Sequence, residues 1–165
     1  MGRQPDNTAD TGQIVAAALT SKEMDDAAQM GPLLDQVTAP LSSVTADGSY
    51  DQDGVYADVA HRHPDAAVIV PPRSTAVLSE MAATAPTQRD RHLPCIAETG
   101  RMTWQKASGY TNRAKVEAAI ERWKQVIGDG LRSRIDERRV TEVNVAVHVL
   151  NRMLELGRPN YVRIV

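Results

Sequence analysis

Residues 41–72, "LSSVTADGSYDQDGVYADVAHRHPDAAVIVPP", contain the pattern that decides the fold class. Residues 42–48 predict a β-strand that runs into Asp-Gly, and residues 66–72 predict an apolar strand that two prolines end. Between them, residues 51–62 predict an amphipathic helix. Its expected N-cap is Asp51 or Asp53, and its expected inner face consists of Val55, Val59 and Ala60. A strand, a helix and a second strand in this order favour parallel pairing, so the sequence predicts an α/β domain.

The flanking segments extend the same alternation. Residues 13–20 form a short apolar run and predict a buried strand, whereas residues 25–37 predict a short helix interrupted by Gly-Pro. Residues 73–108 show no clear periodicity and predict a long basic loop with short elements. A last helix is expected at about 140–156, with Gly157 and Pro159 as its stop signal.

The composition limits the protein classes that remain. A chain of 165 residues is long enough for one domain with a sizeable core. We expect no membrane partner, because no stretch approaches the roughly 18 apolar residues of a spanning helix. The first 12 residues lack the apolar segment of a signal peptide, and the single Cys95 excludes an internal disulfide. These features predict a cytoplasmic protein.

Charge is unevenly distributed along the chain. Residues 1–87 contain 4 Lys or Arg and 12 Asp or Glu, whereas residues 88–139 contain 12 Lys or Arg and 7 Asp or Glu. A basic segment of this size could lie along the phosphates of a nucleic acid. The alternative is an ordinary solvated helical surface.

Residues 109–134, "GYTNRAKVEAAIERWKQVIGDGLRSR", predict a helix with a narrow polar stripe. On an ideal helix the stripe residues project within roughly 60° of one another; they are Tyr110, Arg113, Glu117 and Lys124. The expected buried face lies beside this stripe and consists of Val116, Ile120, Trp123 and Ile127. In isolation, pairs such as Glu117 with Arg113 and Glu121 with Lys124 are also ordinary surface neighbours.

Two carboxylates are candidate ligands of a divalent cation. Asp47 stands where a predicted strand ends, which is where α/β sheets present groups to a cleft, and Glu117 stands on the polar stripe. Carboxylate oxygens suit Mg²⁺, and two of them from different elements could hold it over a phosphate. Arg113 and Lys124 could then contact phosphates. The alternative for Asp47 is a simple turn residue.

The stripe, written Y-x-x-R-x-x-x-E-x-x-x-x-x-x-K, resembles the signature of bacterial insertion-sequence DDE transposases. It is the mark of the superfamily named after insertion sequence four, and the chain is most similar to the insertion-sequence-five group. Further similar stretches are "DTGQIVAAALTSKEMDDAAQMGPLLDQV", "TADGSYD", "RDRHLPCIAETGRMTWQKASGY", "IGDGLRSR" and "EVNVAVHVLNRMLELGRP". The resemblance covers about residues 9–159.

The resemblance implies a ribonuclease-H-like α/β fold and metal-dependent cleavage and strand transfer of transposon-end DNA. Mg²⁺ or Mn²⁺ would be held by two Asp and one Glu, of which Asp47 matches the second Asp and Glu117 the Glu. Tyr110, Arg113 and Lys124 match accessory positions that act on DNA. The implied partner is double-stranded DNA, at the transposon ends and at the target, and association with a second copy stays open.

The first Asp of the family pattern has no counterpart in register. Counting back from the Thr-Gly turn reaches Thr8, and neither Asp6 nor Asp10 falls at that position. The sequence therefore predicts a truncated domain without its first strand, impaired in catalysis. Its expected parts are an atypical N-terminus at 1–8, the catalytic region at 9–159 and a tail at 160–165. The alternative is a non-catalytic DNA-binding or subunit-association fragment of a transposase.

Overall fold

The computed structural model describes residues 11–21 and 23–157. They belong to two compact units, which we call the sheet unit (residues 20–114) and the helical unit (residues 1–19 and 115–165). The expected boundary segments 1–8 and 160–165, and the positions Asp6, Thr8, Asp10 and Pro159, lie outside the described residues. None of the helices in the described ranges has both the length and the apolar character needed to cross a membrane.

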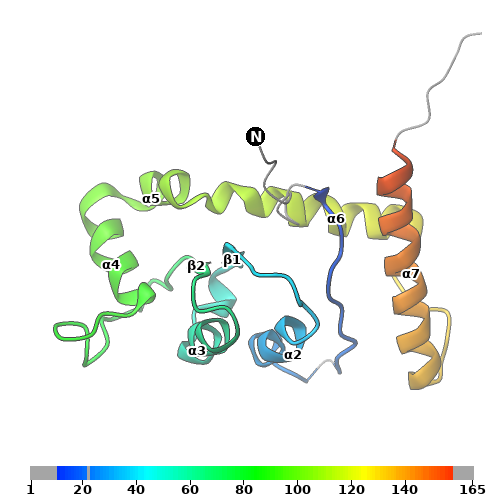
Figure 1. Cartoon of the computed structure of the whole chain (residues 1–165), viewed down its shortest axis with the longest axis horizontal. Helices are drawn as coiled ribbons and strands as arrows, with labels where there is room; N and C mark the ends of the chain where they lie inside the picture. The colour runs from blue at the N-terminus through cyan, green and yellow to red at the C-terminus, as the bar shows by residue number, and fades with distance from the viewer. Residues whose placement is uncertain (1–10, 22, 158–165) are drawn as a thin grey trace, which may run out of the picture. The chain divides into compact units, whose positions relative to one another are not determined.

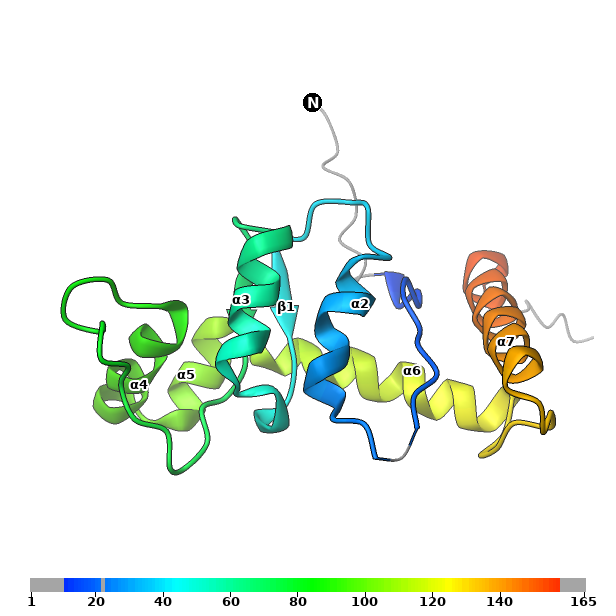
Figure 2. The same ribbon diagram turned by 90° about the horizontal axis from the view of Figure 1, so that it is seen from below.

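The sheet unit contains a two-stranded parallel sheet joined by a helix, as the sequence predicts. Strand β1 (Ser43–Thr45) pairs with strand β2 (Ala67–Ile69), and Val44 lies opposite Val68. Helix α3 (Asp53–Arg62) connects them, and helix α2 (Met30–Leu34) lies beside α3 (Figures 1 and 2). A 3₁₀ helix, η1 (Asp26–Gln29), leads into α2, so the predicted helix at 25–37 is shorter than expected and begins as a tighter coil.

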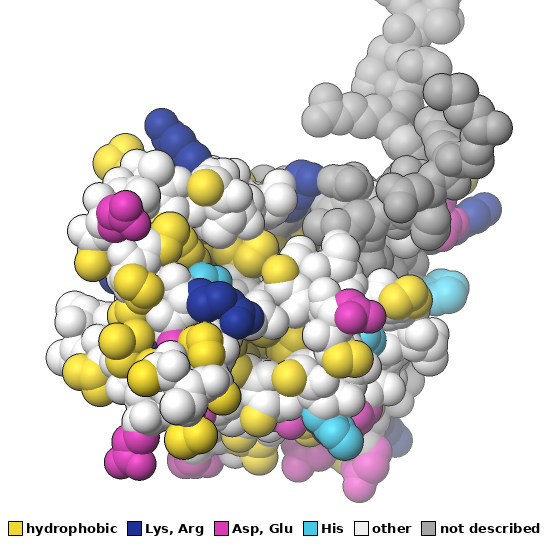
Figure 3. Space-filling model, turned by 60° about the vertical axis from the view of Figure 1, so that its left-hand side comes forward, with side chains coloured by type: hydrophobic (Ala, Val, Ile, Leu, Met, Phe, Trp, Pro, Cys, Tyr) yellow, Lys and Arg dark blue, Asp and Glu magenta, His cyan; other side chains and the backbone are white. Residues whose placement is uncertain are grey.

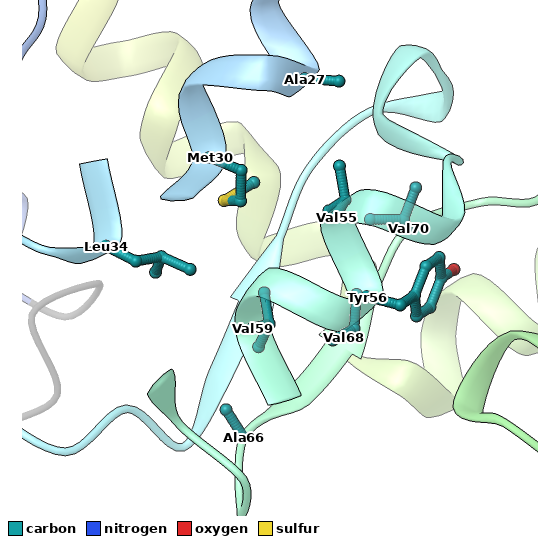
Figure 4. Close-up of a cluster of buried hydrophobic side chains, with 9 residues drawn as sticks. All are labelled: Ala27, Met30, Leu34, Val55, Tyr56, Val59, Ala66, Val68 and Val70. Carbon is teal, nitrogen blue, oxygen red and sulfur yellow. The ribbon is translucent and has the colours of Figure 1, made fainter. Parts of the chain in front are cut away.

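The core of the sheet unit lies between these elements. Figure 4 shows the buried side chains, which come from η1, α2, α3 and the second strand with its flanks. They are Ala27, Met30, Leu34, Val55, Tyr56, Val59, Ala66, Val68 and Val70. The predicted inner face of α3 is right for Val55 and Val59 but wrong for Ala60, which is exposed, because Tyr56 is the third residue that α3 buries.

Residues 88–108 form two helices, so the prediction of a loop over 73–108 is wrong in its second half. Helix α4 (Gln88–Thr99) begins at a capping box in which Thr87 and Asp90 satisfy each other's backbone amides. Helix α5 (Arg101–Ser108) follows after Gly100, whose φ of 83° breaks the continuity of the helix. Pro94 within α4 and Gly100 between the helices interrupt the periodicity, which explains why the sequence pattern does not reveal these helices.

The predicted strand at 13–20 is also wrong, because the segment pairs with a side chain instead of a strand. In the helical unit, the Ile14 amide donates to the Asn151 side-chain oxygen, and the Asn151 amide nitrogen donates to the Ile14 carbonyl, both at 2.8 Å. The Gly12 carbonyl accepts from Arg122 at 2.9 Å. These contacts satisfy main-chain groups that a strand would offer to a neighbour.

Two long helices contribute most of the other described residues of the helical unit. Helix α6 (Arg113–Val126) follows a short 3₁₀ turn of the sheet unit, η3 (Tyr110–Asn112), and enters the helical unit at residue 115, and helix α7 (Asp136–Leu156) buries Ala146 and Leu150. Helix α7 begins earlier than the predicted residue 140, since acidic residues in its first turn suit a helix N-terminus. It ends at Gly157 with a φ of 72°, as expected.

Candidate catalytic site

Asp47 lies at the carboxyl end of β1, on a turn that it also stabilises. The residue is the N-cap of the 3₁₀ helix η2 (Gly48–Tyr50), and its Oδ1 accepts from the Ser49 amide at 2.9 Å and from the Ser49 hydroxyl. Asp47 therefore acts as a turn residue, and its role as a metal ligand stays a prediction. Both contacts with Ser49 use Oδ1, whereas the other carboxylate oxygen, Oδ2, contacts Arg113.

Asp47 Oδ2 forms an ion pair with Arg113, the first residue of α6. The distance from Arg113 Nη2 is 3.5 Å, and the two side chains are 37% and 43% exposed for Arg113 and Asp47. Donation by the Ser49 hydroxyl and then by its amide lowers the pKa of Asp47, partial burial raises it by less, and the Arg113 charge makes the smallest contribution, which lowers it. A long, exposed pair of this kind contributes about 0–1 kcal/mol to stability. Its importance is that it links the end of β1 to the first residue of α6.

The end of β2 lies directly against the Asp47 turn. A side chain at position 48 would come within 3.3 Å of the Pro71 carbonyl oxygen, so glycine permits this close approach. Two residues further on, Arg73 Nε donates to the Gly48 carbonyl at 3.2 Å and Arg73 Nη2 donates to the Ser49 carbonyl at 2.8 Å. The carboxyl ends of both strands thus meet at one turn.

A buried ion pair lies behind this turn. The Asp51 side chain is fully buried, and its Oδ1 accepts from Arg89 Nε at 2.7 Å, while its Oδ2 accepts from the Arg73 amide at 2.8 Å. Asp51 and Asp53 do not cap α3 as predicted, because Gln52 is the N-cap and Asp51 is engaged by residues from beyond β2. Sequence reasoning missed Arg73 and Arg89; the available signal was an arginine directly after the double proline that ends a strand.

Tyr110 packs in an aromatic cluster of the sheet unit. Its ring centroid lies 6.0 Å from that of Trp104, which is buried and lies 5.2 Å from the ring of His92. Burial lowers the pKa of His92, and Arg91 adds to this effect. The prediction that Tyr110 and Arg113 share one regular helix is wrong, because Tyr110 belongs to the 3₁₀ turn η3 that directly precedes α6.

Glu117 and Lys124 lie on α6, and both residues are exposed. Lys124 Nζ lies 3.9 Å from Glu121, which confirms the surface pair expected for these two residues. The predicted buried face of this segment is wrong for Val116 and Ile120, which are 52% and 50% exposed, whereas Trp123 and Ile127 are half-buried. In the described helical unit the buried helix residues, Ala146 and Leu150, both belong to α7, and none belongs to α6.

Charged side chains are distributed over the face of the molecule that Figure 3 shows. Several acidic side chains lie along its lower edge and others at its upper left and right, whereas basic side chains lie near its centre and at its upper edge. Within the part of the chain that the structure describes, no three His, Cys, Asp or Glu side chains come together in a way that could hold a metal ion.

Comparison with known proteins identifies the family. No solved structure matches the chain. The family described as "Transposase DDE domain" matches residues 8–154, which is most of the chain and includes Asp47 and the stripe on α6. Proteins of this family are transposases, which act on DNA and in general use divalent metal ions. The chain belongs to the transposase DDE domain family.

Proposed function

We propose that Asp47 and Glu117 are the second Asp and the Glu of a DDE catalytic centre that cleaves and joins transposon-end DNA. The observation that supports this most is the ion pair between Asp47 and Arg113. It joins the carboxylate at the end of β1 to the arginine of the resembled motif. Glu117 lies four residues after Arg113 on the same helix, and residues at this spacing are neighbours on a helix surface.

The two carboxylates suit Mg²⁺ or Mn²⁺ in their chemistry. Ser49 and Arg113 keep Asp47 ionised, and the contact that its Oδ2 accepts from Arg113 is long, at 3.5 Å. When bound, a divalent cation stabilises the negative charge that develops on the oxygens of a reacting phosphodiester. Asp47 and Glu117 would hold that cation, and Ser49 would keep the Asp47 carboxylate in one orientation.

The basic stripe residues would bind the DNA backbone. Arg113 would contact a phosphate from its place next to Asp47, and Lys124 supplies an exposed point charge on the same helix. The ring of Tyr110 packs against that of Trp104, so its role would be to support the start of α6 next to Arg113. The partner in this proposal is double-stranded DNA.

The parallel pair of strands with its helical crossover supports a ribonuclease-H-like fold for the catalytic region. In such a fold, acidic residues are presented at the carboxyl ends of the strands. Asp47 has this position relative to β1. At the register of the first acidic residue the chain has Thr8, so we propose that catalysis by this chain is weak. With two ligands, the cation would be held less tightly than with three.

A metal-binding and nicking experiment tests the catalytic proposal. Purified protein would be titrated with Mn²⁺ and followed by electron paramagnetic resonance, and then incubated with labelled transposon-end DNA. We expect weak Mn²⁺ binding that Asp47→Asn and Glu117→Gln each remove. Asp65→Asn and Glu98→Gln are matched controls, because both are exposed carboxylates outside the proposed site. Mn²⁺ binding that neither site variant changes would refute the assignment.

The basic segment supports a second candidate function, DNA binding without cleavage. Residues 88–139 have an excess of 5 positive charges, from 12 basic and 7 acidic residues. Counterion release then predicts that affinity for duplex DNA falls steeply with salt. Lys124→Ala should reduce the slope of log affinity against log salt by about 1, whereas Arg152→Ala on α7, outside the segment, should not. An affinity for duplex DNA that does not depend on salt would contradict this candidate function. Whether two copies of the chain associate is a separate question, which sedimentation measurements would answer.

A further inference from the structure

We propose that Arg73 is the positioning residue for the metal ligand Asp47, with Asp51 and Arg89 as its anchor. The inference rests on the proposed function, because Asp47 is a ligand only there. It starts from the two donations by which Arg73 holds consecutive carbonyls of the Asp47 turn, those of Gly48 and Ser49. Each bond has a charged donor, which makes it stronger than a bond between neutral groups.

The turn is thereby held from two sides. On one side the Asp47 carboxylate accepts from the Ser49 amide and hydroxyl, and on the other side the Ser49 carbonyl accepts from Arg73. The peptide units around Ser49 are fixed between these contacts. The Ser49 amide belongs to the same peptide unit as the Gly48 carbonyl, which accepts from Arg73 Nε, so Arg73 holds the peptide whose N–H binds Asp47 Oδ1.

Arg73 is itself held at its backbone. Its amide donates to Asp51 Oδ2 at 2.8 Å, and the same carboxylate accepts from Arg89 Nε at 2.7 Å and Arg89 Nη2 at 3.3 Å. Asp51 is buried, and the Arg89 side chain is 17% exposed. A buried pair with several hydrogen bonds has little freedom to move, so the backbone of Arg73 is held in place.

The side chain of Arg73 is exposed, whereas the side chains of its anchor, Asp51 and Arg89, are largely buried. Removal of the Arg73 side chain thus leaves no cavity and no buried charge in the core. Its loss should therefore change the Asp47 turn while the rest of the sheet unit stays folded. A single substitution of Arg73 can therefore test the proposal. Asp51 is a less suitable position, because its replacement would leave Arg89 without its buried partner.

Hydrogen exchange of individual amides in the full chain, measured by NMR, tests the inference. We expect Arg73→Ala to speed exchange of the Ser49 and Asp51 amides about tenfold, because both belong to the η2 turn. Arg73→Lys should restore part of the protection, since a lysine can still donate to these carbonyls. The matched control is Arg91→Ala, because the exposed Arg91 likewise donates to a carbonyl, that of Pro86 at 3.0 Å, outside the turn and its anchor.

The same spectra separate positioning from a general structural role. The His63 amide, which donates to Val59 at the end of α3, should keep its exchange rate in Arg73→Ala. Equal acceleration at His63 and Ser49, or unchanged exchange at Ser49, would overturn the inference.

Titration with Mn²⁺ then distinguishes this inference from the proposed function. If the wild-type chain binds Mn²⁺ through Asp47, Arg73→Ala should weaken binding about fivefold to tenfold, as expected for a loosened ligand, and unchanged affinity would refute the positioning role. If the wild-type chain binds no Mn²⁺, the proposed metal site is wrong. In that case a local loss of protection at Ser49 still supports Arg73 as the residue that orders Asp47, and its absence still refutes it.

Discussion

Two apolar segments of the molecule, residues 66–72 and residues 13–20, satisfy their backbones in different ways. The first contains β2, which pairs in parallel with β1 and lies in the core of the sheet unit. The second is irregular, and Val15 and Leu19 within it are 48% and 42% exposed. Composition alone does not separate the two segments, because both are rich in Val, Ile and Ala. The difference teaches that an apolar run becomes a strand when a neighbouring backbone is available.

A side-chain amide nevertheless takes the place of a strand in both segments. Asn151 accepts from the Ile14 amide and donates to its carbonyl. On the edge of β2 that faces away from β1, Gln88 accepts from the Val68 amide at 2.8 Å and donates to the Ala66 carbonyl at 3.0 Å. An amide group has one acceptor and two donors, so it can match the pattern that an adjacent strand would offer.

The largest effect should come from a charge placed in the segment that has a partner strand. Val68 is 1% exposed, so Val68→Asp would bury a carboxylate without a counter-ion and should cost about 3–5 kcal/mol. Urea denaturation followed by circular dichroism measures this loss. Val145→Asp on α7, where the valine is 58% exposed, is the control and should change the free energy of unfolding by about 0.5 kcal/mol or less. A small effect of Val68→Asp would mean that β2 is not in a core.

Removal of the amide at the edge of β2 should have the next largest effect. Gln88→Leu would leave the Val68 amide and the Ala66 carbonyl without their side-chain partner, and both residues are buried. An unsatisfied buried group costs about 1–3 kcal/mol, which equilibrium denaturation can detect. Gln125→Leu on the exposed surface of α6 is the matched control. Equal stability of the two variants would show that water replaces the Gln88 amide at no cost.

The corresponding change in the other segment should be smaller. Asn151→Leu removes both bonds to Ile14, but the half-buried Ile14 backbone can be hydrated once the segment moves, so we expect about 0.5–1.5 kcal/mol. Hydrogen exchange at the Ile14 amide should accelerate, whereas exchange at the Val68 amide should not change. If Asn151→Leu costs more than Gln88→Leu, the contrast between the two segments is reversed.

Acid should lower the stability of the sheet unit, which contains β2 and Asp90, without any effect near neutral pH. The amides of Ser79 and Thr87, and then their hydroxyls, lower the pKa of Asp90 below its ordinary value of 3.8. A depressed carboxyl pKa adds stability that is complete above 3.8 and is lost as the pH falls below it. Denaturation at a series of pH values should show this loss in the wild-type chain and a shallower dependence in Asp90→Asn. An equally steep dependence in both proteins would assign the acid sensitivity to other groups.

The sequence predicted the elements whose signals are local. Strand β1, helix α3 and strand β2 follow one another within 43–69 and were expected in that order, with parallel pairing. The prediction failed where a partner lies far away in the sequence. Asp51 was expected to cap α3, but Arg89 binds it from 38 positions away, and no local pattern signals such a pair. Asn151 is likewise 137 positions from Ile14.

The candidate site shows the same division. Periodicity placed Arg113, Glu117 and Lys124 on one helix, which α6 confirms, and strand patterning placed Asp47 at the end of β1. The ion pair that joins Asp47 to Arg113, and the contacts of Arg73 with the turn, depend on tertiary packing. Trp104 was the least predictable, because Gly100 interrupts the helical pattern that places it in the core.

The position of Gln88 has a consequence for aggregation. An unpaired strand edge is a template on which a strand from another molecule can add. On β2 that edge is occupied by the side chain of the first residue of α4, next to the Thr87 cap. An incoming strand would have to displace this side chain and disturb the first helical turn at the same time. The fold thereby guards an exposed edge of its sheet against intermolecular association with one glutamine.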